Sequence, residues 1–256
     1  MLVEAKELFL KRQLEINSTH INEHVASFNS VFINFLPPEA LVEIVSRRPL
    51  LTSLHFGLLV QASCQYLWLQ HEDEFRGLKS WGQILPIMME KHQREMVDLV
   101  VNKNISITDP RRYVILRIVN SIVFEDQPVT ILDIGSGFIP LGIGTLLKTG
   151  DVPLPDLVDV SAKESLNRYC LKNNNIQKII ATDVQLPDAS WVAACGWLSL
   201  DGLVELNTRL SEEADKPLIP TIEFRQLDIV GDNIDSVKDF EKKVDLVMMS
   251  NIRYQL

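Results

Sequence analysis

The sequence predicts a mixed α/β protein, with an all-helical domain over residues 1–126 and a doubly wound parallel sheet over residues 127–256. Apolar residues recur at helical spacing up to about residue 126, and no glycine-turn hairpin interrupts them. From Gln127 onward, short apolar strands alternate with helical segments, a pattern typical of a parallel sheet with right-handed crossovers. The first of these strands ends in a glycine turn that leads into a helix.

The helices of the first half are expected between proline-containing breaks. Pro37-Pro38 and Pro49 interrupt the apolar pattern, and Thr108-Asp109-Pro110 is typical of a helix start, with a capping side chain before proline at the first turn. The helices expected from these breaks cover residues 39–45, 50–70, 81–101 and 110–123. Together with the N-terminal segment, this predicts roughly five to seven helices.

Four strands are expected in the second half, at residues 129–134, 154–160, 222–230 and 244–250, with helices between them at 141–147, 162–174, 190–213 and 236–242. A rival to the third strand is KIIATD, which ends at Asp183. We prefer the segment IEFRQLDIV, which contains Asp228, because it is longer and alternates better. Residues 184–220 then form a helical insertion that covers the ligand cleft.

Composition narrows the classes of function. The 25 basic and 34 acidic residues give a net charge of −9, which disfavours a nucleic-acid partner but leaves room for a local basic patch. The three cysteines have no motif spacing, so neither a disulfide framework nor a zinc knuckle is expected. The charged N-terminus lacks a signal-peptide core, and residues 49–70 are too polar to cross a membrane. We therefore expect a cytoplasmic protein without membrane contact.

No metal site is expected from the motifs. His20 and His24 have the spacing of inverted zinc proteases and share a helix face, but the sequence offers no third ligand. A solvated helix face is the simpler interpretation.

The segment ILDIGSGFIPLGIG carries the main chemical signal. A strand ends at Asp133, the tight turn Gly135-Ser136-Gly137 follows, and a helix begins near Leu141. Glycines let the backbone approach a ligand closely, and a helix N-terminus offers free N–H groups. Asp159 stands 22 positions beyond Gly137, where an acid can accept both ribose hydroxyls of a nucleoside. The pattern predicts a nucleoside-containing cofactor at the carboxyl ends of the strands.

These residues resemble the first motif of the class I S-adenosylmethionine-dependent methyltransferases, which have a Rossmann-like sheet. The likeness covers roughly residues 128–256. It implies that Asp133, Gly135 and Gly137 line the methionine part of S-adenosyl-L-methionine, with Ser136 among the cofactor-binding residues. A dinucleotide fits less well, because position 140 of the turn is proline where a glycine is usual.

The same resemblance assigns the remaining cofactor contacts. Asp159 would hold the ribose, and Asp228 with the backbone of Ile229 would lie at the adenine. Asp183 is the rival of Asp228 for the adenine contact. Ser250 and Asn251 would face the transferring methyl group. The resemblance names no catalytic base.

The sequence departs from the family in several places. Ile139 replaces a frequent third glycine, and no Asn-Pro-Pro-Tyr follows the fourth strand, so amide methylation is not supported. The family sheet has seven strands, whereas this sequence stops just past the fourth. We therefore expect either that this sequence is a truncated piece of a longer protein, or that a second copy of the chain, as a homodimer, or another segment completes the sheet.

The leading function is a methyltransferase acting on a small molecule, with the helical domain as lid or substrate-docking surface. One alternative is a non-catalytic cofactor-binding or interaction protein on the same fold. Another is an RNA methyltransferase, because residues 137–141 are similar to the aminoglycoside-resistance ribosomal RNA methyltransferases, which carry an N-terminal helical domain. A nucleotide-dependent oxidoreductase is the least favoured.

Overall fold

The computed structural model divides the chain into two compact units. One contains Met1–Ser106 and Ala189–Arg209, and the other contains Ile107–Asp188 and Leu210–Leu256. The described residues are 28, 31–32, 35–51, 53–106, 110–147, 175–196, 198–216, 221–228, 240 and 244–249.

The first unit is helical. Its elements are α3 (Pro38–Arg47), α4 (Ser53–Gln70), the short 3-10 helix η1 (Glu72–Phe75), α5 (Trp81–Asn102), α9 (Ala189–Ala194) and the first part of α10 (Leu200–Ala214). These bounds confirm the expected helices at 39–45, 50–70 and 81–101. The predicted helix at 190–213 is instead two helices, separated by a turn that includes Gly196.

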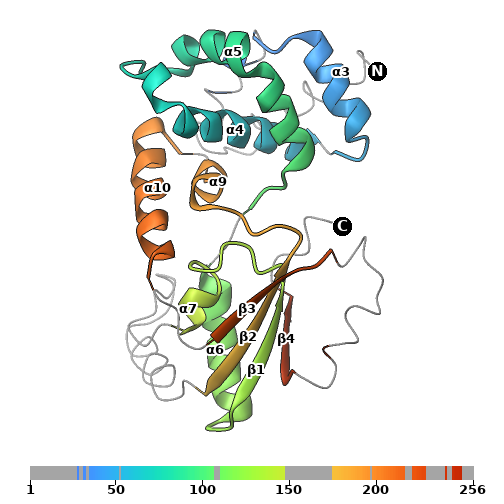
Figure 1. Cartoon of the computed structure of the whole chain (residues 1–256), viewed down its shortest axis with the longest axis vertical. Helices are drawn as coiled ribbons and strands as arrows, with labels where there is room; N and C mark the ends of the chain where they lie inside the picture. The colour runs from blue at the N-terminus through green and yellow to red at the C-terminus, as the bar shows by residue number, and fades with distance from the viewer. Residues whose placement is uncertain are drawn as a thin grey trace. The chain divides into compact units, whose positions relative to one another are not determined.

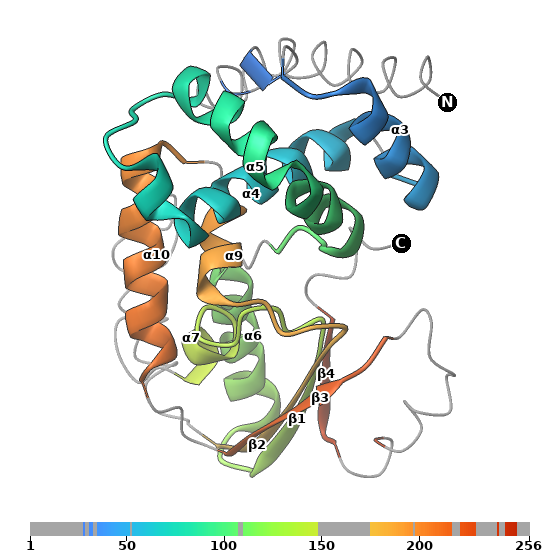
Figure 2. The same cartoon turned by 45° about the horizontal axis from the view of Figure 1, so that its top comes forward.

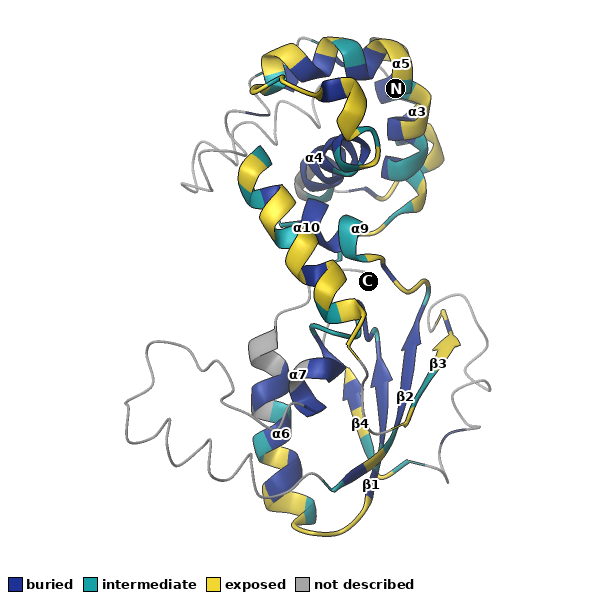
Figure 3. Ribbon diagram, turned by 60° about the vertical axis from the view of Figure 1, so that its left-hand side comes forward, coloured by how far each residue is buried: buried dark blue, intermediate teal, exposed yellow. Residues whose placement is uncertain are grey.

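Helix α4 is the centre of this unit (Figure 3). Every residue from 56 to 65 is buried, so the helix has no solvated face over these turns, and it packs against both α5 and α9. The side chain of Gln65 donates from Nε2 to the carbonyl of Leu198, 2.8 Å away. Trp191 in α9 donates from Nε1 to the carbonyl of Asn104 at 2.9 Å. These bonds join the chain segment after residue 189 to α4 and to the residues that follow α5.

The second unit is built on a parallel sheet (Figures 1 and 2). Its strands are β1 (Val129–Ile134), β2 (Ile176–Asp183), β3 (Thr221–Gln226) and β4 (Leu246–Met249), in the order β3-β2-β1-β4. All three pairings are parallel, and Asp133 is in register with Ala181 on one side and with Met248 on the other. The expected α/β class with a parallel sheet is confirmed.

Residues alternate between the two faces of β1, as expected for a central strand. Val129 and Ile131 pack with Tyr113 of α6 (Pro110–Phe124) and with Ile143 of α7 (Ile143–Leu147). Leu132 and Ile134 belong to a separate cluster on the opposite face, with residues Ile180, Leu227 and Phe240. Helices α6 and α7 therefore cover one face of the sheet, and Asp133, which alternates with Leu132 and Ile134, is on their side.

Strand β2 corrects the sequence-based choice between two strands. KIIATD and IEFRQ both form strands, and they pair with each other. The choice against KIIATD was wrong because Ile179, Ile180 and Ala181 are buried between β1 and β3, which gives this segment one of the most interior positions in the sheet. The strand expected at 154–160 and the helix expected at 162–174 lie outside the described residues.

The contacts divide the chain between Ser106 and Ile107, and not at the expected domain boundary at residues 126–127. Helix α6 belongs to the unit that contains the sheet, because Tyr113, Leu116 and Phe124 pack on residues of β1, β2 and α7. Residues 189–209, expected as an insertion within the sheet domain, belong to the helical unit.

Strand β4 is an outer strand of the sheet as far as the structure describes it. Its apolar side chains Val247 and Met249 are 49 % and 61 % exposed. Within the described part of the chain, none of the helices has both the length and the apolar character that a membrane crossing requires.

Candidate functional site

The glycine turn after β1 is tied to the end of β2. Gly135 and Gly137 have φ angles of +71° and +57°, in the left-handed region that glycine tolerates best. The backbone N–H groups of Gly135 and Ser136 both donate to the carbonyl of Thr182, at 2.8 and 3.0 Å. In return, the Thr182 hydroxyl donates to the carbonyl of Asp133 at 3.2 Å. The turn is therefore held by backbone geometry rather than by its own side chains.

Asp133 is a fully buried acid whose carboxyl group has one hydrogen-bond partner among the side chains that the structure describes. The hydroxyl of Tyr113 donates to Oδ2 at 2.9 Å, whereas Oδ1 is buried and has no hydrogen-bond partner among the described residues. Burial raises the pKa of Asp133 to about 7; the Tyr113 hydrogen bond opposes this rise, and the nearby charge of Asp183 adds to it. Near neutral pH, the groups that contact Asp133 therefore decide whether its carboxyl group is charged.

Gly142 sets the position of the Tyr113 ring. A Cβ atom at this position would lie 2.8 Å from both Cζ and the hydroxyl oxygen of Tyr113, closer than real Cβ contacts allow. Glycine at position 142 therefore lets the residues before α7 lie against the tyrosine ring. Through that ring, Gly142 also preserves the hydrogen bond to Asp133.

Asp183 ends β2 beside the same turn. Its carboxylate accepts the backbone N–H of Gly137 at 2.8 Å and those of Val184 and Gln185, and the residue is 9 % exposed. Burial raises the pKa of Asp183, and these three backbone hydrogen bonds counteract part of the rise. Two carboxyl groups from adjacent strands therefore meet at the carboxyl end of the sheet.

The turn also holds a buried hydroxyl. Ser136 is fully buried, and its Oγ has no hydrogen-bond partner within the described ranges. Buried polar atoms are normally paired, so Ser136 Oγ and Asp133 Oδ1 are two exceptions among the described residues. Both lie in the segment Asp133–Gly137. Together they offer an acidic acceptor and a hydroxyl to a ligand that carries donors or a positive charge.

The structure brings together only part of the predicted cofactor-binding set. Asp133, Gly135, Ser136 and Gly137 form the turn as expected. Asp228 is exposed, two residues past the end of β3, and its neighbour Leu227 donates from its backbone N–H to the carbonyl of Asp183 at 2.9 Å. The remaining members lie outside the described residues: Asp159, Ile229, Ser250 and Asn251.

The sequence singles out Asp183, which ends an apolar run, as the rival of Asp228 for the adenine contact, but it does not show that Asp183 holds the glycine turn. Two other contributors to this site are not predicted from the sequence. Tyr113 and Gly142 carry no sequence signal, because their importance arises from packing of α6 and the residues before α7 against β1.

Comparisons of the chain with models of known protein families, with curated protein sequences and with solved structures found no match.

Proposed function

We propose that the chain binds S-adenosyl-L-methionine and is a methyltransferase acting on a small molecule. The observation that carries the proposal is the position of the glycine turn. The strand order β3-β2-β1-β4 corresponds to the first four strands of the doubly wound order 3-2-1-4-5-6. In such Rossmann-like sheets, ligands bind at the carboxyl ends of the strands where the order reverses, which here is beside β1.

The acids around the turn support a nucleoside cofactor. Asp183 ends the strand adjacent to β1, where an acid can accept ribose hydroxyls, and Asp228 follows the next strand. Asp183 therefore joins Asp159 as a candidate for the ribose contact. Asp228 remains the candidate for the adenine contact.

The unsatisfied groups of the turn suit the methionine part of this cofactor. S-adenosylmethionine supplies an electrophilic methyl group on a sulfonium, and its amino-acid end carries an ammonium. An ammonium at Asp133 Oδ1 would favour the ionised carboxylate and would satisfy a buried acceptor. Because Oδ1 and the Ser136 hydroxyl are both buried, binding there requires a local movement of the turn. The role of these residues is to orient the cofactor.

The acidic balance favours a small-molecule substrate over RNA, since phosphate binding depends on clustered cations. The helical unit contains a pocket of about 480 Å³ that would suit such a substrate. Its lining residues include Trp68, Trp81, Leu198 and Asp201. We assign substrate docking to this unit.

Calorimetric titration of the full chain with S-adenosylmethionine, S-adenosylhomocysteine and NAD tests the cofactor. We expect the first two to bind and NAD not to bind. Binding of none of the three would reject the proposal, and binding of NAD alone would favour a nucleotide-dependent oxidoreductase.

Substitution of Asp183 tests the ribose contact. Asp183→Ala should weaken S-adenosylmethionine binding about 10- to 100-fold, because a hydrogen bond to a charged group contributes about 1.5–3 kcal/mol. Asp159→Ala tests the alternative position in the same way, and the exposed Asp215→Ala is the matched control. If Asp183→Ala and Asp215→Ala bind equally well, Asp183 does not hold the cofactor. Thermal unfolding of each variant separates lost binding from lost folding.

Product formation distinguishes a methyltransferase from a non-catalytic binding protein on the same fold. Incubation with S-adenosylmethionine and either small-molecule extracts or ribosomal RNA should yield S-adenosylhomocysteine only with the former. Tight binding without turnover in both mixtures would favour the non-catalytic alternative, and turnover with RNA alone would favour the RNA methyltransferase.

A further inference from the structure

A cluster of two histidines and two glutamates lies in the helical unit, apart from the glycine turn. Glu74 lies in η1 and His71 is the residue before η1, whereas His92 and Glu95 both lie in α5. Each pair has the spacing His-x-x-Glu, which places both side chains on one side of a helical turn. The two pairs face each other, so all four side chains meet.

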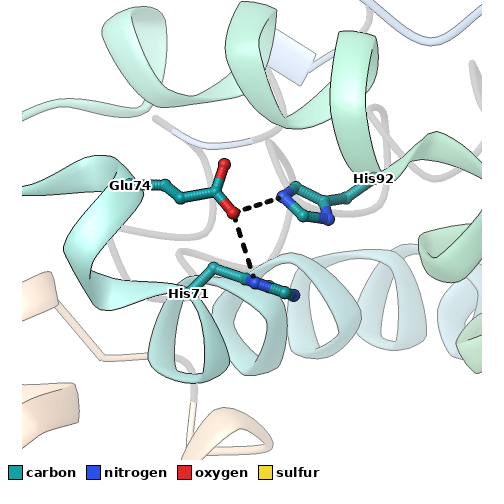
Figure 4. Close-up of side chains that lie close together, drawn as sticks. All are labelled: His71, Glu74 and His92. Atoms are coloured by element: carbon teal, nitrogen blue, oxygen red, sulfur yellow. Dashed lines mark ion pairs between the residues drawn. The ribbon is translucent and has the colours of Figure 1, made fainter.

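The imidazole rings are stacked between the two carboxylates. Their centroids are 4.0 Å apart and their planes differ by 28°. Glu74 Oε1 lies 3.5 Å from His71 Nδ1 and 3.4 Å from His92 Nε2, as Figure 4 shows. On the other side, Glu95 Oε2 lies 3.6 Å from His71 Nε2 and 3.5 Å from His92 Nδ1. Each carboxylate thus faces one nitrogen of each ring.

These distances fit a shared ion better than direct hydrogen bonds. Hydrogen bonds from nitrogen to oxygen are about 2.7–3.2 Å long. The Nε2 atoms of both histidines are buried and have no hydrogen-bond partner among the residues that the structure describes. Around tetrahedral zinc, with ligands about 2.0–2.1 Å from the metal, neighbouring ligand atoms lie about 3.3–3.4 Å apart. The separations at Glu74 Oε1 are close to that value.

The burial of the four residues distinguishes the two carboxylates. The side chain of His92 is 12 % exposed, those of His71 and Glu74 are 29 % and 34 % exposed, and that of Glu95 is 52 % exposed. His71, Glu74 and His92 are also the set whose ligand atoms all lie within 4.8 Å of one another. Lys91 holds the other oxygen of Glu74, Oε2, at 2.8 Å, which leaves Oε1 facing the histidines.

We propose that His71 Nδ1, His92 Nε2 and Glu74 Oε1 bind one divalent transition-metal ion, with zinc the best fit to this nitrogen and oxygen set. Glu95 Oε2 lies 3.6 and 3.5 Å from the other nitrogen of each ring, and it would accept their N–H groups once the rings turn onto the ion, as outer carboxylates do at histidine-bound metals. Binding turns the rings out of their stacked arrangement so that both lone pairs point at the ion. The fourth position takes water, and the ion joins η1 to α5.

Titration of the full chain with Co²⁺ and Zn²⁺, after treatment with a chelator, tests the site. We expect one equivalent of Co²⁺ with the absorption of a tetrahedral nitrogen–oxygen site, and we expect Zn²⁺ to displace it and to raise the unfolding temperature. His71→Ala/His92→Ala should lose this binding by at least about tenfold. The matched control is His20→Ala/His24→Ala, which removes the same number of imidazoles and should retain it.

Three results would overturn the proposal. One is equal Co²⁺ binding by the parent and by His71→Ala/His92→Ala, and another is loss of binding in His20→Ala/His24→Ala instead. The third is a thiolate-to-cobalt charge-transfer band, which would assign the ion to cysteine. If circular dichroism shows that the double alanine variant is unfolded, Glu74→Gln decides, because it keeps the shape of the side chain and removes the ligand charge. Unchanged affinity in Glu74→Gln would also overturn the site.

Discussion

The glycine turn and the histidine–glutamate cluster place carboxyl groups in opposite environments. At the turn, Asp133 is fully buried beside a second acid, and burial raises its pKa to about 7. In the cluster, Glu74 is partly exposed, and the hydrogen bond from Lys91 is the largest of the effects that lower its pKa. The same chemical group is therefore harder to ionise than usual in one region and easier to ionise in the other. Burial and the nearest charge decide how readily each carboxyl group ionises.

The two regions also differ in what holds them. The turn is held through its own backbone N–H groups, since the carbonyl of Thr182 accepts two of them and the carboxylate of Asp183 accepts a third. The cluster depends on four side chains that approach from η1 and α5. Changes at the turn should therefore alter stability, whereas changes in the cluster should mainly alter cation binding.

The largest expected effect comes from removing the ionisable group at Asp133. The pKa of Asp133 rises from 3.8 to about 7 on folding, so the folded chain holds a proton that the unfolded chain releases. The contribution of this proton to the free energy of unfolding is fully present below pH 3.8 and is lost as the pH rises to about 7. At 1.36 kcal/mol per pKa unit, the loss amounts to up to about 4 kcal/mol. Asp133→Asn cannot ionise and should lose this dependence.

Urea unfolding of both proteins across that pH range measures the difference. The stability of Asp133→Asn relative to the parent should increase from acid to neutral pH and level off above about pH 7. A difference that stays constant with pH would show that Asp133 keeps its ordinary pKa, and the contrast with Glu74 would fail.

Gly142→Ala should have the next largest effect. The added Cβ would meet the Tyr113 ring at 2.8 Å in a buried position, and overpacking of this kind costs about 1–3 kcal/mol. Displacement of the ring would also weaken the bond from Tyr113 to Asp133. Gly82→Ala is the control, because its nearest atoms are 4.0 Å away. Equal unfolding midpoints for the two variants would contradict the proposed role of Gly142.

Lys91→Met should have the smallest effect on stability, because Lys91 and Glu74 are both solvent-accessible. It should nevertheless raise the affinity for Co²⁺ several-fold, since it removes a positive charge 2.8 Å from Glu74. Lys79→Met removes the same charge from an exposed position outside the cluster and is the control. A lower Co²⁺ affinity in Lys91→Met would mean that the lysine positions the carboxylate more than it repels the cation.

Local patterns in the sequence determined much of this molecule. The strand at Val129–Ile134, its glycine turn and the helix that begins at Pro110 occur where composition and spacing predict them. Such features depend on neighbouring residues: apolar alternation selects a strand, glycine permits the positive φ angles at 135 and 137, and proline marks a first helical turn.

Only the tertiary structure decided which distant segments meet. KIIATD forms an inner strand because it pairs with β1 along one edge and with β3 along the other, and α6 belongs with the sheet because Tyr113 packs on β1. The pairing of His71 with His92 and of Glu74 with Lys91 likewise joins residues about twenty positions apart in sequence, as Figure 4 shows for the histidines. Periodicity shows which face of an element is apolar, but not which other element will cover it, and the raised pKa of Asp133 follows from that covering.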